Sequence, residues 1–397
     1  MDNKIIEQCY HRSIELLIKN SNHYGVIAAI PVEKAMRVRY DYIFGRDACI
    51  CALGMVASQN KKLIKIAKAS LETLAKHQTK YGQIPYSVNP SKDGALFYFL
   101  GCIDSTLWWL IALDFYHKYS GDRMLHVKFQ PKIKKALKWL MCQDQNNCGL
   151  LEQCESADWT DDIAGSGKVL YSNALWIKVL DIYGLKKEKK LALDGLNNIF
   201  LPHLANPRRS EYLKRDIHRI KELNIIRERV DNVPYYLNYI GYKSGNDRCD
   251  VYGNCLAILF NAPSPVRAES IIRYLRNQKA SRKYPVQVLF PPIEPGDYDW
   301  KAYMDREECL NQPECYHNGG IWPYIGCFWA MVLKKIGLDK LAGQEMEKVA
   351  AANKVNDWEF NEWFHGRTGK PMGMAGQSWN AGMFLLAHHY LKGEVEF

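Results

Sequence analysis

Apolar residues recur at helical spacing along the whole chain. Between residues 5 and 17 they return every three or four positions, which predicts an amphipathic helix. The same periodicity predicts helices over 48–57, 63–77, 105–119, 133–142, 171–183, 191–199, 252–259, 268–277, 322–336, 342–352 and 377–391. Strand patterns are few, and the best covers 284–290. The pattern therefore predicts an all-α chain of about a dozen helices.

The segments between these helices combine charged and aromatic side chains with glycine. They recur at about the same phase of the helical repeat, for example at 40–47 (YDYIFGRD), 246–254 (NDRCDVYGN) and 316–323 (YHNGGIWP). If the helices alternate direction in a closed ring, every second connection lies on one rim and its side chains converge on one cavity. An open solenoid has a similar repeat length, but its repeats share a motif that is absent here. We therefore favour the ring.

Composition places the chain among soluble globular proteins. Of its 397 residues, 47% are apolar and 24% charged. Nothing resembles a linker, so we predict a single domain over residues 1–397. The first residues lack the apolar core of a signal peptide, and no run is apolar enough to cross a membrane, which predicts a cytoplasmic protein. Twelve cysteines in spacings that match no zinc motif then indicate reduced thiols and no metal site.

The net charge of +10 is dispersed along the chain. Its densest basic stretch, 208–229, interleaves acidic residues at helical spacing, which is typical of a solvated helix face. We therefore expect no nucleic-acid partner and no membrane partner. The sequence leaves open whether copies of the chain form a homo-oligomer.

The stretch 155–176 (ESADWTDDIAGSGKVLYSNALW) suggests acid–base chemistry. Asp161 follows Trp159 where a loop gives way to a helix. An indole ring beside a carboxylic acid excludes water and raises the pKa of the acid. An aspartate at such a junction is more often a helix cap, and Asp161 and Asp162 also fit that use.

A second acidic stretch near the end of the chain has the same character. Residues 358–369 (WEFNEWFHGRTG) surround Glu362 with aromatic side chains and a glycine turn. Two carboxylates framed by aromatic residues on such loops are what sugar-cleaving enzymes use. The pair Asp161 and Glu362 is therefore the central hypothesis.

Two further motifs have both a binding and a structural interpretation. Arg46 and Asp47 can offer opposite charges to neighbouring sugar hydroxyls, or they can form a buried ion pair at a helix start. His317 in YHNGG can donate to a sugar or cap the helix that follows it. The sequence alone does not decide between these two roles of His317.

Three long segments resemble the alkaline/neutral invertases of glycoside hydrolase family 100, and more distantly the glucoamylase-like and debranching α-glycosidases. They are 97–122 (FYFLGCIDSTLWWLIALDFYHKYSGD), the span from YGNCLAIL through YPVQVLFPPIEPGDYDW to YHNGGIWP at 252–323, and 362–391 (EWFHGRTGKPMGMAGQSWNAGMFLLAHHYL). They follow one another in the family's order and are spread over most of the chain, from 97 to 391. The YDYIFGRDA motif at 40–48 is nearer to the debranching type.

The resemblance implies an (α/α)6 barrel with loop insertions on one rim. It places the general acid on Asp161 and the general base on Glu362. We further expect sugar contacts from Arg46, Asp47 and Trp159. The pocket would be lined further by Asp104, Trp108, Asp250, His317, Trp322 and Gln377.

We therefore predict an inverting, exo-acting α-glycosidase that cleaves a small α-glycoside without a metal or organic cofactor. Inversion requires the two carboxyl groups to stand roughly 6.5–9.5 Å apart. The substrate is a sucrose-like disaccharide or a glycosylated solute such as glucosyl- or mannosylglycerate. The alternatives are a debranching-type amylo-1,6-glucosidase, a silent sugar-binding protein on the same barrel, and a helical scaffold for a protein partner.

Overall fold

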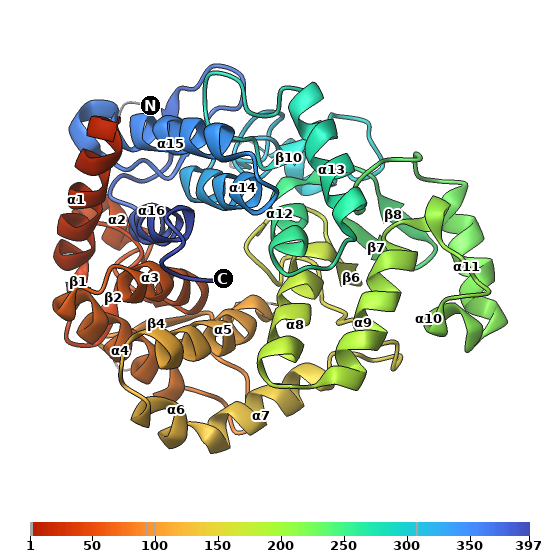
Figure 1. The fold of residues 1–397 in the computed structure, drawn as a ribbon, viewed down its shortest axis with the longest axis horizontal. Helices are drawn as coiled ribbons and strands as arrows, with labels where there is room; N and C mark the ends of the chain where they lie inside the picture. Colours follow the sequence, from red (N-terminus) through yellow and green to blue (C-terminus); the bar gives the residue numbers. More distant parts are fainter. Residues whose placement is uncertain (1–2, 93, 99, 307–308) are drawn as a thin grey trace. The chain divides into compact units, whose positions relative to one another are not determined.

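The computed structural model describes residues 3–92, 94–98, 100–306 and 309–397, and helices dominate it (Figure 1). All twelve predicted helices are present. They are α1 (Asn3–Lys19), α3 (Gly45–Ala57), α4 (Lys61–Lys76), α5 (Asp104–Tyr119), α7 (Gln130–Met141), α8 (Leu170–Ile182), α9 (Lys186–Ile199), α12 (Val251–Leu259), α13 (Pro265–Asn277), α14 (Pro323–Lys335), α15 (Asp339–Trp358) and α16 (Ser378–Leu391).

Shorter elements fill the connections. The helices are α2 (Glu33–Arg37), α6 (Met124–Lys128), α10 (Glu211–Lys214) and α11 (Ile217–Arg227), with 3-10 turns η1 (Pro202–Leu204) and η2 (Ala302–Asp305). The strands are β1 (Ser21–Asn22), β2 (Gly25–Val26), β3 (Ile43–Phe44), β4 (Ser87–Asn89), β5 (Gly94–Leu96), β6 (Lys168–Val169), β7 (Tyr239–Gly241), β8 (Ser244–Asn246), β9 (Cys249–Asp250), β10 (Leu289–Phe290), β11 (Trp363–Phe364) and β12 (Pro371–Met372). All pair antiparallel, in the orders β3-β4-β5, β6-β7-β8, β1-β2, β10-β9 and β11-β12.

The strand predicted over 284–290 is largely wrong, since only Leu289–Phe290 is a strand. Its alternating pattern reflects an extended backbone whose N–H groups bond to other partners. Val286 donates to the Glu345 carboxylate at 2.9 Å, and Val288 donates to the Gly320 carbonyl at 3.0 Å. Pro285, Val286, Val288 and Leu289 are buried, so apolar residues of this segment are buried without forming a paired strand over its length.

The described chain forms two compact units. Unit 1 comprises residues 1–139, 282–286 and 321–397, and unit 2 comprises 140–281 and 287–320. Unit 1 therefore contains the predicted base, and unit 2 the predicted acid. This division into units does not test the prediction of one catalytic domain over 1–397, which stays a prediction. Within the described residues, no helix has the length and apolar character needed to cross a bilayer.

The core of unit 1 is built on α3, which packs against α16, α4 and α5 (Figure 1). Two glycines allow α3 and α16 to approach closely. A Cβ on Gly54 would lie 1.8 Å from the carbonyl oxygen of Gly382, and a Cβ on Gly382 would lie 2.6 Å from Cα of Cys51. Only glycine fits at both positions, so this helix pair depends on backbone contact.

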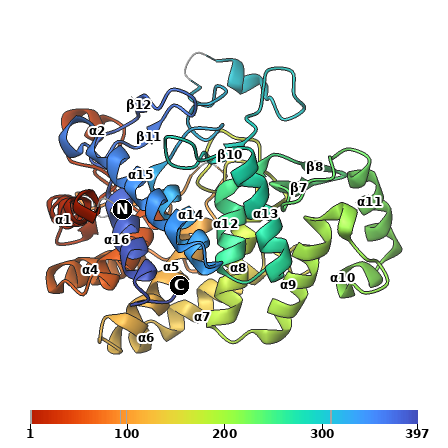
Figure 2. The same cartoon turned by 45° about the horizontal axis from the view of Figure 1, so that its top comes forward.

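In unit 2, helix α8 packs against α9 and α12. The loop before α8 joins the sheet β6-β7-β8 through Gln153, which pairs with Gly167 next to β6. The hairpin β7–β8 and the short helices α10 and α11 lie side by side in both views (Figures 1 and 2). They form an outer layer over α9.

Candidate active site

Glu362 lies in unit 1, directly before β11, and is 5% exposed. Its carboxylate accepts a 2.7 Å hydrogen bond from the Tyr40 hydroxyl and a 2.9 Å bond from the backbone N–H of Met374. Gly373 adopts a φ of +74°, and a Cβ there would lie 2.5 Å from the Glu362 carboxylate. The turn before α16 therefore leaves room for one buried, oriented carboxyl group.

Burial governs the acidity of this group. Burial, with a smaller contribution from the negative charge of Asp47, raises the pKa of Glu362 from 4.5 to about 7. The hydrogen bonds from Tyr40 and Met374 act in the opposite direction because they stabilise the charged form. A base whose pKa lies near neutrality is the strongest one that is still ionised at physiological pH.

Arg46, Asp47 and Asp104 form a buried charge cluster at the starts of α3 and α5. Arg46 donates to the Asp104 carboxylate at 3.0 Å, and its Nε lies 3.4 Å from the Asp47 carboxylate. Burial raises the pKa of Asp47 to about 6, with Arg46 lowering it and Asp104 raising it. The buried ion pair between Arg46 and Asp47, which was the structural alternative, is therefore present. The charge of Asp47 also acts on the carboxyl group of Glu362.

Gln377 and Trp322 are buried at the starts of α16 and α14. Trp322 packs edge-to-face on Trp379 with ring centroids 5.5 Å apart, and the Arg46 guanidinium lies 5.7 Å from the Trp379 ring. Among the described residues, no group accepts a hydrogen bond from Nε2 of Gln377 or from the indole N–H of Trp379. Two such buried donors beside a charge cluster are suited to a hydroxyl-rich ligand.

Trp108 occupies a different environment. Its side chain is fully buried on α5 and packs on Phe328 and Phe397 with ring centroids 6.2 and 6.5 Å apart. These neighbours are core residues, so the structure assigns Trp108 a packing role, and its predicted sugar contact stays a prediction.

In unit 2, Asp158 organises the loop that carries the predicted acid. Its carboxylate accepts bonds from the Thr160 backbone at 2.9 Å, the Thr160 hydroxyl at 2.7 Å and Nε2 of Gln153 at 2.8 Å. Asp161 follows with a φ of +39°, in the left-handed region that costs a non-glycine residue about 1–2 kcal/mol. The loop thus holds Asp161 in a conformation set by its neighbours, and Asp161 does not cap α8, which begins only at Leu170.

Trp159, His317 and Tyr252 form an aromatic cluster in the same unit. The Trp159 ring meets His317 edge-to-face at 4.6 Å and Tyr252 at 5.5 Å. His317 is held by its backbone N–H, which donates to Asn311 at 2.9 Å. The helix that follows has Trp322 as its N-cap residue and no side-chain hydrogen bond at its cap. The structure therefore does not support the capping role for His317.

Asp250 caps α12, since its carboxylate accepts a 2.9 Å bond from the Gly253 N–H. Burial raises its pKa to about 7, and the charge of Asp158 adds to this effect. Unit 2 therefore brings together Asp158, Trp159, Asp250 and His317 by contact or by electrostatic interaction.

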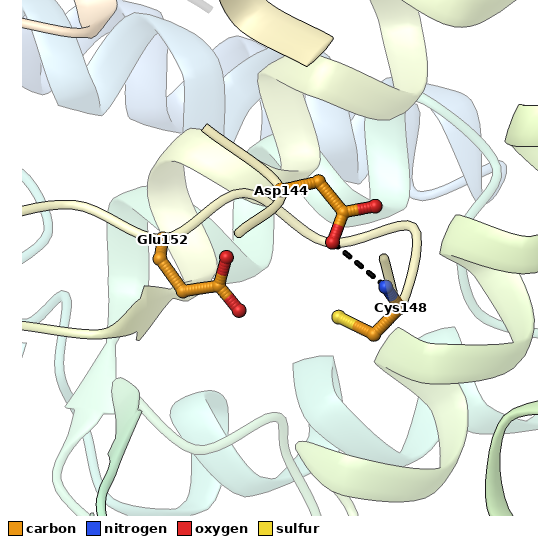
Figure 3. Close-up of side chains that lie close together, drawn as sticks. All are labelled: Asp144, Cys148 and Glu152. Carbon is orange, nitrogen blue, oxygen red and sulfur yellow. Dashed lines mark hydrogen bonds between the residues drawn. The ribbon is translucent and has the colours of Figure 1, made fainter. Parts of the chain in front are cut away.

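A cluster of metal-ligand type lies elsewhere in unit 2. Atoms of Asp144, Cys148 and Glu152 lie within 4.8 Å of one another (Figure 3). Hydrogen bonds account for the arrangement: Asp144 accepts the backbone N–H of Cys148 and of Gly149 at 2.7 Å, and Glu152 pairs with Lys168 at 2.5 Å. Burial raises the pKa of the Cys148 thiol to about 12. These side chains therefore stabilise the loop that follows α7.

Comparison with known proteins shows which family the chain resembles. The family model described as alkaline and neutral invertase matches residues 220–393. The chain is 22% identical to alkaline/neutral invertase C, mitochondrial, of Arabidopsis thaliana, over 91% of this chain and only 63% of that protein's length. It is also 22% identical to probable alkaline/neutral invertase F of the same plant, over 91% of this chain and 83% of that protein. The resemblance to the alkaline and neutral invertases is confirmed.

Solved structures extend the comparison to the fold. A GH63 mannosylglycerate hydrolase from Thermus thermophilus, in complex with glucose, matches with a TM-score of 0.67 at 14% identity, over 95% of this chain and 98% of that one. A GH78 family rhamnosidase of Bacillus sp. GL1 matches with a TM-score of 0.62 at 13% identity, over 97% of this chain and 34% of that one. The predicted all-α barrel class is confirmed by this likeness. At 13–14% identity, these glycosidases share a fold with this chain.

Sequence reasoning missed three residues at the candidate site. Tyr40 bonds to Glu362, Trp379 carries the buried indole N–H, and Asp158 shapes the loop of the predicted acid. Each lies in a stretch already marked as unusual, but Tyr40 is 322 residues from Glu362. Only the folded structure connects the two.

Proposed function

We propose that this protein is an inverting α-glycosidase acting on a small α-glycoside. The observation that carries the proposal is Glu362, a buried carboxyl group whose two oxygens are held by Tyr40 and Met374 and whose pKa lies at about 7. It lies in the segment that the invertase family model matches.

In the proposed reaction, Glu362 removes a proton from the attacking water, and Asp161 donates a proton to the glycosidic oxygen. A general acid and a general base acting in one displacement invert the anomeric configuration. The strained backbone at Asp161 supports this role, because residues held in rare conformations cluster at functional sites.

The remaining site residues would bind the sugar. Gln377 and Trp379 offer buried donors to sugar hydroxyls, and Arg46, Asp47 and Asp104 offer a preorganised charge cluster that can donate and accept. In unit 2, Trp159, Asp250 and His317 would contribute the sugar contacts that accompany the acid. Trp322 supports the ring of Trp379.

The similar proteins support a proposal for the substrate class. The resemblance to the invertases implies a sucrose-like disaccharide, and the structural relative from Thermus thermophilus is named a mannosylglycerate hydrolase. We propose a disaccharide or a glycosylated small solute, cleaved in the cytoplasm. Several relatives are named mitochondrial or chloroplastic, so the location is a separate proposal.

Proton NMR of the anomeric products tests this function. The purified protein is incubated with sucrose, isomaltose, trehalose, maltose, glucosylglycerol, glucosylglycerate and mannosylglycerate, and the first sugar released is observed before mutarotation. Release of a β-sugar from an α-linked substrate is the expected result. Initial release of an α-sugar would refute inversion, and binding of a sugar without turnover would favour the silent sugar-binding alternative.

A further inference from the structure

A cavity of about 320 Å³ lies within unit 2. It is lined by residues of α9, α10, α11, the strands β6 and β7 and the loop that follows α7. Small-molecule sites typically occupy roughly 300–1,000 Å³, so this one suits a small ligand. None of the residues predicted for catalysis or sugar binding lines it. The side chains that matter here are Glu152, Lys168, Tyr212, Arg219, Glu222 and Tyr242.

Charges of both signs line the cavity and largely offset one another. Lys168 is paired with Glu152 at 2.5 Å. Arg219 donates to the backbone carbonyls of Tyr212 at 3.1 Å and Asn146 at 3.4 Å, and its guanidinium lies 4.5 Å from the Tyr212 ring. An anionic ligand would meet the carboxylates of Glu152 and Glu222. The lining therefore favours a neutral ligand that both donates and accepts hydrogen bonds.

Tyr212 supplies a polar group without a protein partner. Its side chain is 3% exposed, and its backbone N–H donates to the Asp194 carboxylate at 2.6 Å. Its hydroxyl makes no hydrogen bond with any residue in the described ranges, although Tyr212 lines the cavity. The hydroxyl oxygen is not among the fully buried unpaired atoms, so solvent reaches it from the cavity, and a ligand hydroxyl that replaces this water keeps the hydrogen bond.

Tyr242 supplies an aromatic surface at the same cavity. It lies in the turn between β7 and β8, is 81% exposed, and has the Lys243 ammonium 5.0 Å from its ring centroid. An exposed aromatic ring beside convergent polar groups can pack on the apolar C–H face of a sugar while those groups bind its hydroxyls.

We propose that this cavity is a second carbohydrate site that binds a neutral mono- or disaccharide, separate from the catalytic residues. Tyr242 packs on the sugar ring, Tyr212 bonds to a hydroxyl, and the paired charges of Lys168 and Glu152 offer a donor and an acceptor. The proposal does not depend on the reaction proposed above, because binding at this cavity can be observed without turnover.

Fluorine NMR of the full-length protein labelled with 3-fluorotyrosine tests the site directly. A Glu362→Gln background prevents hydrolysis, and Tyr212→Phe and Tyr242→Phe each remove one resonance and so assign it. Glucose, sucrose and maltose are titrated separately. Both assigned resonances are expected to shift saturably with at least one sugar, while Tyr81, which is 70% exposed and belongs to unit 1, does not follow the same curve.

A second variant separates binding from labelling effects. Tyr242→Ala alters an exposed side chain and leaves the fold intact, and it is expected to weaken the sugar response of Tyr212 by up to about tenfold, the value of one aromatic contact. In protein that retains Glu362, the Tyr242→Ala substitution is expected to leave turnover at the catalytic site unchanged. Two outcomes would overturn the proposal: neither resonance moves with any of the three sugars, or both move only with inorganic phosphate or glucose 6-phosphate, which would indicate an anion site.

Discussion

Replacing Glu362 by glutamine is expected to abolish turnover and, at alkaline pH, to stabilise the fold. The carboxyl group is buried, and its pKa rises from 4.5 to about 7 on folding. The difference of about 2.5 units corresponds to roughly 3 kcal/mol between the two protonation states, at about 1.36 kcal/mol per unit. Glutamine has the same shape and no charge, so it avoids that cost.

The sign of the pH dependence follows from linkage. Between pH 4.5 and about 7 the folded protein holds a proton on Glu362 that the unfolded chain has released. The stability associated with this proton is fully present below about pH 4.5 and is lost as the pH rises through about 7. We therefore expect the variant and the wild type to have similar stability near pH 4.5, and the variant to be more stable by roughly 3 kcal/mol above about pH 8.

Calorimetric unfolding of both proteins at one-unit steps from about pH 4.5 to 9 measures this difference. Glu359→Gln is the matched control, since it removes a carboxylate three positions away that is only partly buried. The control is expected to show no such pH-dependent gain and to keep its activity. A stability difference that does not change with pH, or a wild type that is the more stable in alkaline buffer, would refute the reasoning.

Three further predictions concern the same units. Tyr40→Phe removes a hydrogen bond to the charged form of Glu362 and is expected to move the acidic limb of the kcat/KM profile to higher pH by up to about one unit; an unmoved limb would contradict the assignment. Asp161→Asn is expected to lower kcat by roughly 10²–10⁴-fold in steady-state assays. Asp162→Asn, at an exposed position, is the control and is expected to keep near-normal turnover. Equal losses in the two variants would argue against Asp161 as the acid. Gly54→Ala is expected to destabilise unit 1 by about 1–3 kcal/mol although alanine favours helices, and a raised melting temperature would show that α3 and α16 are less closely packed.

The helices could be predicted because their signal is local. Apolar periodicity within ten to twenty residues decides which face is buried, and the structure contains every helix so predicted. The strand at 284–290 failed because the same alternation occurs in an extended segment whose hydrogen bonds go to Glu345 and Gly320. Apolar periodicity predicts which residues are buried, but it does not predict which group the backbone N–H and C=O bond to.

The environment of the site could be predicted only in part. Glu362 and Asp161 stood out by composition, but the pKa of Glu362 is raised by burial and lowered by the bonds from Tyr40 and Met374, all of which are set by folding. The stretch 208–229 was interpreted as a solvated helix face, and most of α11 is exposed or only partly buried, as expected. Tyr212 and Arg219 line the cavity instead, and no local pattern marks them.

The glycine contact between α3 and α16 also bears on how the protein is made. Helix α3 ends at Ala57 and its partner begins at Ser378, so a ribosome must synthesise more than three hundred further residues before the two can meet. Until then the apolar surface of α3 lacks one of its main neighbours. Contacts between such distant segments slow folding. A nascent chain of this protein is therefore expected to depend on chaperones, and its last helix completes the core of unit 1.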